Sequence, residues 1–444
     1  MKRRTFLKTL GIGAGAFMAH NYLRPRRAFA AADRSFVFCY FRGGWDTLLS
    51  LDPRDPNVFT EARREETRIE LAWDQLPANY PRTILQPSGS NIQFGPVMEA
   101  MAPHYEKMCV ARGLSMNTVA HDVGRRYFIT GQTPRGNTAA GSAVPTRIVA
   151  QQGDQSPFPN LVMGAETYND GLPAFASGLT VNSVTDLVTS LTVGPGAPPA
   201  AVRDRIAAYR DGKPLCDPVG HDRRGLLTRL GDSQIKAREL VESGLSSKFA
   251  FNNANDSEMT ALRSRYGIQN IDGVPAQAAA AFQALKYELT QVITIDATQN
   301  LDTHDGNWAT DQPDNQAEGW TALAQLITDL ESEPDPARGG TLLDNTTILC
   351  FSEFSRTPLL NNRGGRDHHL ATSCALIGAG VPGNRVVGAT SDVGMTPMAI
   401  DPNTGAVQDG GTIITPTLVI ASLMQAAGYD VTALRTDGLP CLMA

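Results

Sequence analysis

The residues with the clearest capacity for chemistry form one short segment, Asp367-His368-His369, which follows Gly364-Gly365-Arg366. The chain has only seven histidines, and two of them are adjacent here. An apolar, β-branched run over 346–351 precedes this segment and leads into Glu353. Loops at the carboxyl ends of parallel strands are where α/β proteins present ligands, and His and Asp bind metals such as Zn²⁺. The segment indicates either a metal-binding loop or a solvated polar loop.

Other apolar runs also lead into acids or histidines. Asp46 follows the run 35–41, and Asp302 and His304 follow the run 292–295. His121 begins a predicted helix just after the run 107–113. Carboxyl ends of parallel strands share one edge of a sheet, so these groups are expected to lie together. Mixed nitrogen and oxygen ligands suit Zn²⁺ or Mn²⁺ first and Ca²⁺ second, and two ions roughly 4 Å apart would suit displacement at phosphorus or sulfur.

The elements that must position these residues alternate between strands and helices. The apolar runs predict strands at 35–41, 107–113, 292–295, 346–353 and 371–377. The amphipathic patterns predict helices at 91–106, 121–130, 144–151, 222–248, 276–292, 316–333 and 414–428. This order predicts an α/β fold, with a mostly parallel central sheet and helices on both faces. The domain is expected to span 33–444, with residues 201–290 forming a helical insertion or cap.

The first thirty residues read as a targeting segment and not as part of the fold. Arg3-Arg4-Thr5-Phe6-Leu7-Lys8 is typical of a twin-arginine export signal, and a short Gly/Ala-rich apolar stretch follows it. Ala28-Phe29-Ala30 predicts cleavage after Ala30, or after Ala32 if the neighbouring match is used. No other stretch is long and apolar enough to span a membrane. The mature protein is therefore expected to be periplasmic or secreted.

Charge and cysteine content limit the partners and the compartment. Without the seven basic residues of the signal, 32 basic residues face 45 acidic ones, a net charge near −13. Such a balance argues against nucleic acid as a partner. Four cysteines that lie in apolar runs are expected to be buried thiols, namely Cys39, Cys109, Cys350 and Cys374. A Cys216–Cys441 disulfide is an open alternative in an oxidising compartment.

Nucleotide-binding and serine-hydrolase classes find little support in the sequence. Residues 378–383 match G-x-G-x-x-G, but Pro382 and the residues after it do not open a helix. A pyrophosphate would therefore meet no helix N-terminus there. The sequence contains neither a P-loop nor a G-x-S-x-G elbow.

Four segments together resemble a known bacterial family. They are Phe-Arg-Gly-Gly-Trp-Asp (41–46), Asp-Thr-His (302–304), Ser-Glu-Phe-Ser-Arg-Thr-Pro (352–358) and Gly-Gly-Arg-Asp-His-His (364–369). In this order and spacing they resemble domain-of-unknown-function family 1501, which is itself similar to the alkaline phosphatase and sulfatase superfamily. The resemblance covers nearly the whole mature chain, and it implies an alkaline phosphatase-like fold that binds one or two divalent ions.

The superfamily pattern implies a role for each matching residue. Asp46, and the pair Asp302 and His304, fall at metal-binding positions, and His368 or His369, next to Asp367, matches the late metal-binding histidine. Glu353 ends the strand that normally carries an Asp-His pair. In sulfatases the nucleophile stands nine residues before a Thr-Gly, and here Thr130-Gly131 places His121 at that position and Arg125 at the sulfatase arginine position.

Two departures from the pattern leave three alternatives open. His121 replaces a hydroxyl or thiol nucleophile, and Phe354 replaces the His of the Asp-His pair. In the first alternative His121 joins Asp46 and Glu353 at a second metal, and a metal-activated water attacks the substrate. In the second, His121 is a nucleophile that becomes phosphorylated. In the third, the site binds metal without catalysis.

The expected functions follow from these alternatives. The leading one is an exported metal-dependent hydrolase of phosphate or sulfate esters, with a small anionic ester as its substrate and Arg125 assisting the oxyanion. The other is a catalytically degenerate member of the superfamily that serves as a metal-containing binding protein, with a partner at the cell envelope.

Overall fold

The structure is a computed structural model that describes residues 34–194, 196–211, 226–298 and 300–444. The predicted signal peptide (1–30) and Cys216 lie outside these residues, so export and the Cys216–Cys441 disulfide remain predictions. None of the described helices is long and apolar enough to cross a membrane.

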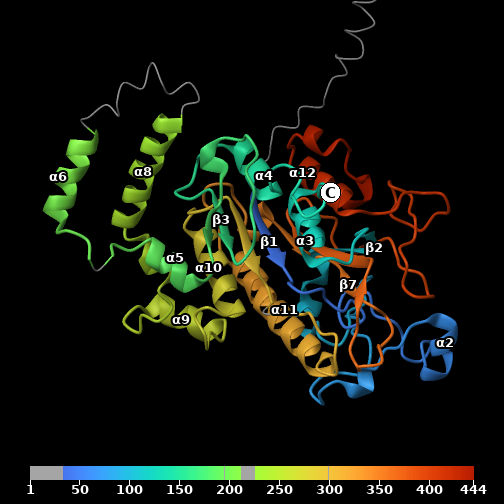
Figure 1. The fold of residues 1–444 in the computed structure, drawn as a ribbon. Coiled ribbons are helices and arrows are strands. Elements are labelled where there is room, and N and C mark those ends of the chain that lie inside the picture. The colour runs from blue at the N-terminus through green and yellow to red at the C-terminus, as the bar shows by residue number, and fades with distance from the viewer. Residues whose placement is uncertain (1–33, 195, 212–225, 299) are drawn as a thin grey trace, which may run out of the picture.

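One central sheet of eight strands organises the molecule, in the spatial order β10-β2-β9-β6-β1-β5-β3-β4 (Figure 1). Its strands are β1 (Ser35–Tyr40), β2 (Met108–Ser115), β3 (Asn160–Met163), β4 (Leu179–Val181), β5 (Val292–Asp296), β6 (Thr346–Phe351), β9 (Ala371–Gly378) and β10 (Arg385–Val387). A small second sheet pairs β7 (Ser355–Arg356) with β8 (His368–His369).

The sheet is mostly parallel, as predicted. Strand β1 pairs in parallel with β5 on one side and β6 on the other, with Cys39 opposite Ile295 and Cys350. Strand β9 is the exception, since it runs antiparallel to both β6 and β2. The parallel trio β5-β1-β6 therefore ends at one edge, and the loops that follow these strands carry Asp46, Asp302 and Glu353.

Helices cover both faces of the sheet (Figure 1). The helices of the described residues, of which α2, α6 and α8 lie away from the sheet, are α2 (Arg64–Thr67), α3 (His121–Thr130), α4 (Val144–Gln152), α5 (Val184–Ser190), α6 (Ala200–Asp211), α8 (Leu226–Glu242), α9 (Ser257–Arg265), α10 (Val274–Lys286), α11 (Trp308–Ser332) and α12 (Pro416–Ala426). The core has two parts. Val37 and Cys39 of β1 pack with α10 and α11, whereas Phe36, Phe38 and Tyr40 pack with α3, α4 and α12. Strand β1 is buried on both faces for this reason.

Each predicted element but one has an observed counterpart, although α11 begins at Trp308 instead of 316 and α10 ends at Lys286 instead of 292. Helix α3 spans the predicted residues, and the four cysteines that were expected to be buried are buried. The prediction of an amphipathic α-helix over 91–106 is wrong: the structure has a 3-10 segment, η3, at Glu99–Lys107 only. Pro103 lies inside it, and proline removes a backbone donor and clashes with the preceding turn of an α-helix.

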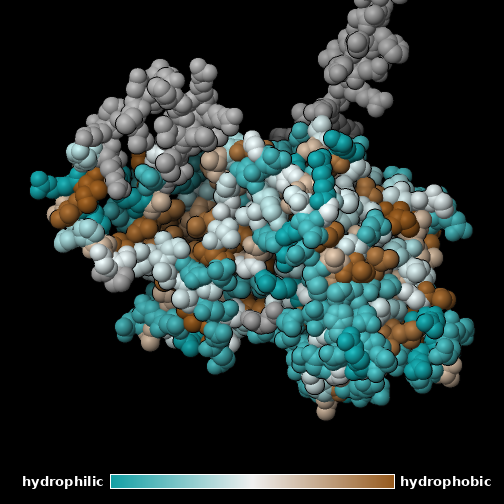
Figure 2. All heavy atoms as spheres, viewed as in Figure 1, coloured by the Kyte–Doolittle hydropathy of each residue, from teal (hydrophilic) through white to brown (hydrophobic). Residues whose placement is uncertain are grey.

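The segment predicted as a helical insertion contains helices in two different settings. Helix α10 is almost entirely buried and packs against α11, as part of the main body. Helices α6 and α8 lie at one side of the molecule, beyond the β4 edge (Figure 1). Val202, Ile206 and Tyr209 of α6 are exposed, and Figure 2 shows hydrophobic surface on that side. A capping role for α6 and α8 remains a prediction.

Two glycines allow the loops at the carboxyl edge to approach one another closely. Gly43 has φ +105°, and a Cβ there would lie 2.5 Å from the main-chain nitrogen of Leu301. A Cβ at Gly365 would lie 2.2 Å from the carbonyl carbon of His304. Real Cβ atoms do not tolerate such contacts, so glycine at these positions is what brings the three loops onto Asp302 and its neighbours.

Candidate metal centre

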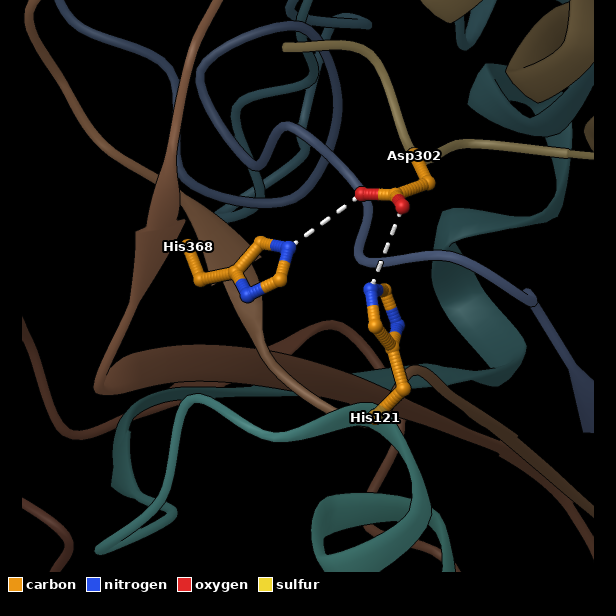
Figure 3. Close-up of side chains that lie close together, drawn as sticks. All are labelled: His121, Asp302 and His368. Atoms are coloured by element: carbon orange, nitrogen blue, oxygen red, sulfur yellow. Dashed lines mark hydrogen bonds and ion pairs between the residues drawn. The ribbon is translucent and has the colours of Figure 1, made fainter.

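His121, Asp302 and His368 converge at the carboxyl edge of the sheet (Figure 3). One ligand atom from each lies within 4.8 Å of the others. His121 is the first residue of α3, Asp302 lies in the loop after β5, and His368 lies in β8. Segments far apart in the sequence therefore bring two imidazoles and a carboxylate to one point.

Asp302 is the centre of this group. Its Oδ2 lies 3.3 Å from His121 Nε2, and its Oδ1 lies 3.2 Å from His368 Nε2. His304 belongs to the same group, because its Nε2 lies 3.0 Å from Asp302 Oδ1 and 2.9 Å from His368 Nε2. Three imidazole Nε2 atoms thus surround one carboxylate.

Each of the three imidazoles is held from behind through its other nitrogen. Nδ1 of His121 lies 2.8 Å from Glu353 Oε1, Nδ1 of His304 lies 2.8 Å from Asp367 Oδ1, and Nδ1 of His368 lies 2.7 Å from the carbonyl oxygen of Val119. A carboxylate or carbonyl can only accept, so each Nδ1 carries the proton when the ring is neutral. The three Nε2 lone pairs are then directed at the Asp302 region, which is how metal-binding histidines are oriented in proteins, and that of His304 also faces Arg356 Nη1 at 3.4 Å.

The donor set fits a divalent cation. His121 Nε2 is buried and makes no hydrogen bond of normal geometry, although it faces Asp302. A buried nitrogen without a partner is costly unless an ion or water satisfies it. Two imidazole nitrogens and a carboxylate oxygen, with a third imidazole beside them, are kinds of ligand that Zn²⁺ prefers, and Mn²⁺ accepts them too.

Arg356 controls the charge of Asp302. Its Nη2 lies 2.6 Å from Asp302 Oδ1, and its side chain is fully buried, whereas Asp302 is 39% exposed. Burial alone would raise the pKa of Asp302, but the Arg356 guanidinium and then His368 outweigh it and lower this pKa to about 2. Asp302 is therefore a carboxylate at every physiological pH.

The surroundings shift the pKa values of His368 and His121 in opposite directions. Burial lowers the pKa of His368. For His121 burial acts in the same direction, but the hydrogen bond and charge of Glu353 outweigh it, so its pKa is raised. Glu353 is 1% exposed, and its pKa is lowered because His121 outweighs the effect of burial. Glu353 thus supports His121 as a buried anion and lies behind it, not among the converging Nε2 atoms.

Phe354 packs the imidazoles against one another. Its ring centroid lies 4.8 Å from that of His121 and 4.3 Å from that of His368, and the residue is fully buried. The residue that departs from the superfamily pattern is therefore a packing partner of two of the converging histidines. Its apolar ring also keeps solvent from that side of the group.

Besides Glu353, four of the predicted site residues lie outside the converging group. The Asp46 Oδ2 atom lies 2.9 Å from Arg366 Nε and accepts a hydrogen bond from Trp308 Nε1 at 2.9 Å, while its Oδ1 accepts from the Leu48 main chain. Asp367 lies behind His304. His369 alternates to the other side of β8, where its Nδ1 accepts from Ala371 N. Arg125 pairs with Asp122 at 2.7 Å and Glu166 at 2.6 Å.

Two functional features were not evident from the sequence. The Val119 carbonyl that holds His368 is a main-chain atom, which no residue pattern reveals. Arg356 and Arg366 are both fully buried and are paired with Asp302 and Asp46, a role that the motifs around them do not indicate. A signal for this was available, because both arginines stand in otherwise buried segments, and a buried guanidinium requires a carboxylate.

Replacing Glu353 with glutamine is expected to weaken divalent-metal binding about 10- to 100-fold, the usual effect of losing a partner behind a metal-binding histidine. The amide preserves shape but removes the charge that fixes the His121 Nδ1 proton. Calorimetric titration with Zn²⁺ measures the change. Glu166→Gln is the matched control, since Glu166 pairs with Arg125 of the same helix and has no contact with His121. Equal affinities for the wild type and Glu353→Gln would contradict this role.

Two cavities among the described residues differ in their relation to the converging group. A groove of about 1090 Å³ runs between the loops around 154–160 and 171–179 and helix α8, and no residue of the converging group lines it. A smaller one of about 330 Å³ is lined by Thr357, Leu360, Asn361 and Asp367 among others, on the Nδ1 side of His304. The chemistry of the converging side chains, and not cavity size, identifies this edge as the candidate site.

Comparison with known proteins adds a family to this geometry. The model of a family described as "Protein of unknown function (DUF1501)" matches residues 33–403. The chain belongs to this family. No curated protein matches it.

Solved structures match most of the chain at low identity. They include i-CgsB in complex with k-i-k-neocarrahexaose, at 9% identity and a TM-score of 0.39, covering 92% of this chain and 75% of that one. The lipoteichoic acid synthase LtaP from Listeria monocytogenes matches at 8% identity and 0.39, with the same coverage. A putative sulfatase from Bacteroides thetaiotaomicron matches at 9% and 0.34, covering 91% and 75%. At these scores the likeness carries no information on substrate.

Proposed function

We propose that this protein is a metal-dependent hydrolase of phosphate or sulfate esters. The observation that supports it best is the convergence of three imidazole Nε2 atoms on Asp302, with every Nδ1 held from behind by an oxygen. Such a set of prepared lone pairs around a carboxylate is costly to build and is typical of a metal centre. A bound divalent ion would polarise the ester and activate water.

The residues of the site favour water over a side chain as nucleophile. In the part of the chain that the structure describes, the polar partners of His121, Asp302, His304 and His368 are carboxylates, imidazoles, a guanidinium, two side-chain amides and main-chain atoms, without a hydroxyl or thiol. His121 itself is less suited to attack a phosphoryl group. Its Nε2 faces the Asp302 carboxylate at 3.3 Å, and an anionic substrate would be repelled from that position.

The chain's own residues would hold and orient the reactants. His121, His368 and Asp302 would bind the ion with His304 beside them, and Glu353 and Asp367 would keep two of the rings in place. Phe354 excludes water from the buried side of the imidazoles. Asp302 stays ionised because of Arg356, so acidification to the mildly acidic range would not remove this ligand's charge.

One observation favours the second candidate, a binding protein that contains metal but does not catalyse. Arg125, the residue predicted to assist the oxyanion, is engaged by Asp122 and Glu166 and does not contact the converging group. Oxyanion stabilisation is usually the largest single contribution to catalysis of this kind, so its loss would leave a metal site of low activity.

We further propose that the protein acts outside the cytoplasm, in the periplasm or after secretion. The twin-arginine segment at 3–8 and the cleavage pattern at 28–30 support this. A substrate in that compartment would be a small anionic ester or an ester group of an envelope component.

Bound metal and ester hydrolysis together test the proposal. The purified mature protein is analysed for metal by mass spectrometry and assayed on phosphomonoesters, phosphodiesters and sulfate esters, beside His121→Ala and the matched surface variant Asp305→Asn. We expect bound Zn²⁺ or Mn²⁺ and turnover on one ester class, both lost in His121→Ala and retained in Asp305→Asn. A folded protein without metal would contradict the proposal, and metal without turnover on any ester would favour the binding protein.

A further inference from the structure

A buried guanidinium lies against the same carboxylate as the three histidines. The Arg356 side chain is fully buried, with Nη2 2.6 Å from Asp302 Oδ1 and Nη1 3.4 Å from His304 Nε2. Asp302 and His304 are the pair that an ion on this side of the carboxylate would need as ligands. The guanidinium therefore occupies the space that such an ion would need.

Arg356 is not free to leave this place. Its Nε donates to the Gly44 carbonyl at 2.9 Å, its Nη1 donates to the Arg366 carbonyl at 3.2 Å, and its Nη2 also donates to the Gly43 carbonyl. These acceptors are main-chain atoms of two different loops at the carboxyl edge. The rigid planar fork of a guanidinium suits such a set of fixed acceptors, and an ammonium does not.

Asp46, the other carboxylate at which an additional ion was predicted, is neutralised in the same way. Arg366 is fully buried, its Nε lies 2.9 Å from Asp46 Oδ2, and its guanidinium lies over the Trp308 ring, 4.6 Å from the centroid. A metal ion bound at Asp46 would lie beside the Arg366 guanidinium in the buried interior, where two positive charges repel each other strongly.

We propose that the centre holds one divalent ion, for which His121, His368 and Asp302 are the ligands, and that the Arg356 guanidinium takes the place of a second ion beside Asp302 Oδ1 and His304. Asp302 would then serve both the ion and an organic cation. Arg356 acts through Asp302 as a positioning residue, because its own donors are all directed into the protein. This inference rests on the proposed function, which requires that the site binds metal, and it adds that one ion is bound per chain.

The metal content of the wild-type protein tests the number directly. Zn²⁺ bound per chain is counted by mass spectrometry after removal of free metal, and the Mn²⁺-loaded protein is examined by electron paramagnetic resonance. We expect one ion per chain and the spectrum of an isolated Mn²⁺. Two ions per chain, or a spectrum of exchange-coupled ions, would overturn this inference while leaving the proposed function intact. A chain that binds no ion would overturn both.

Variants at Arg356 test whether its guanidinium is what limits the chain to one bound ion. Arg356→Met removes the charge and releases Asp302 Oδ1 and His304 Nε2, so Zn²⁺ binding is expected to rise from one ion to two per folded chain. Arg356→Lys retains a cation and is expected to stay at one ion, as is Arg63→Met, a surface control whose partner is Glu66. A folded Arg356→Met chain that still binds one ion would overturn the assignment. If that variant does not fold, the wild-type count and spectrum still decide.

Discussion

Replacing Asp302 with asparagine is expected to weaken divalent-metal binding by more than about 100-fold. Four-ligand structural zinc sites gain about 10–16 kcal/mol, or roughly 3 kcal/mol per ligand, and each 1.4 kcal/mol is a factor of ten. Asp302 is the carboxylate on which the three imidazoles converge, so its replacement removes the charged ligand and the group that faces each Nε2. Competition titration with a chromogenic zinc chelator measures the change.

The control for this experiment is unusually close in the chain. Asp305 stands three residues further along the same loop, is 67% exposed, and pairs with the exposed Arg363 at 3.3 Å. Asp305→Asn makes the same chemical change without touching the converging group, and surface ion pairs contribute at most about 1 kcal/mol to stability. If both variants bind zinc as tightly as the wild type does, Asp302 is not a ligand.

Asp302→Asn should also lower the free energy of unfolding, because Arg356 loses its counter-charge. Breaking a fully buried ion pair costs about 3–5 kcal/mol, but Asp302 is 39% exposed and the asparagine oxygen can still accept from Arg356, so about 1 kcal/mol is expected here. Urea unfolding in the presence of a chelator separates this effect from the loss of metal.

The second large effect is expected at Asp46, and it should affect folding, not metal. Asp46 and Arg366 are 1% and 0% exposed and are 2.9 Å apart. Asp46→Asn leaves the Arg366 guanidinium without an opposing charge, and Arg366→Met leaves the Asp46 carboxylate without one. Each change is expected to lower the free energy of unfolding by about 3–5 kcal/mol. Urea unfolding followed by circular dichroism measures it.

Metal binding distinguishes this role from the one expected for Asp46 from the sequence. The folded Asp46→Asn protein is expected to bind Zn²⁺ with wild-type affinity and stoichiometry. If it binds one ion fewer than the wild type does, Asp46 is a metal ligand. The double variant Asp46→Leu/Arg366→Met removes both charges, so it should recover much of the stability that each single change costs. Arg63→Met, which breaks an exposed pair with Glu66, should remain within about 0.5 kcal/mol of the wild type.

Local sequence patterns were sufficient to predict most of the fold. Uninterrupted apolar runs such as 35–41 predict buried parallel strands, and β1 is indeed paired on both sides and covered on both faces. Helix α3 was predicted from the periodicity of residues 121–130, which places His121 at its first turn. The α-helix predicted over 91–106 does not form, because Pro103 has no N–H to donate and the chain forms only a 3-10 segment at Glu99–Lys107.

The sequence by itself determined that acids and histidines follow the strands β1, β5 and β6, since residue order alone places a polar group after each apolar run. It could not determine which carboxylate remains available to a metal. Asp46 and Asp302 both follow parallel strands, and each is paired with an arginine. Asp46 is completely buried, and its Oδ2 contacts Arg366 and Trp308, whereas Arg356 pairs with Oδ1 of Asp302 and leaves Oδ2 facing His121. That difference depends on charge pairing between distant loops in a dry interior, and only the tertiary structure sets those distances.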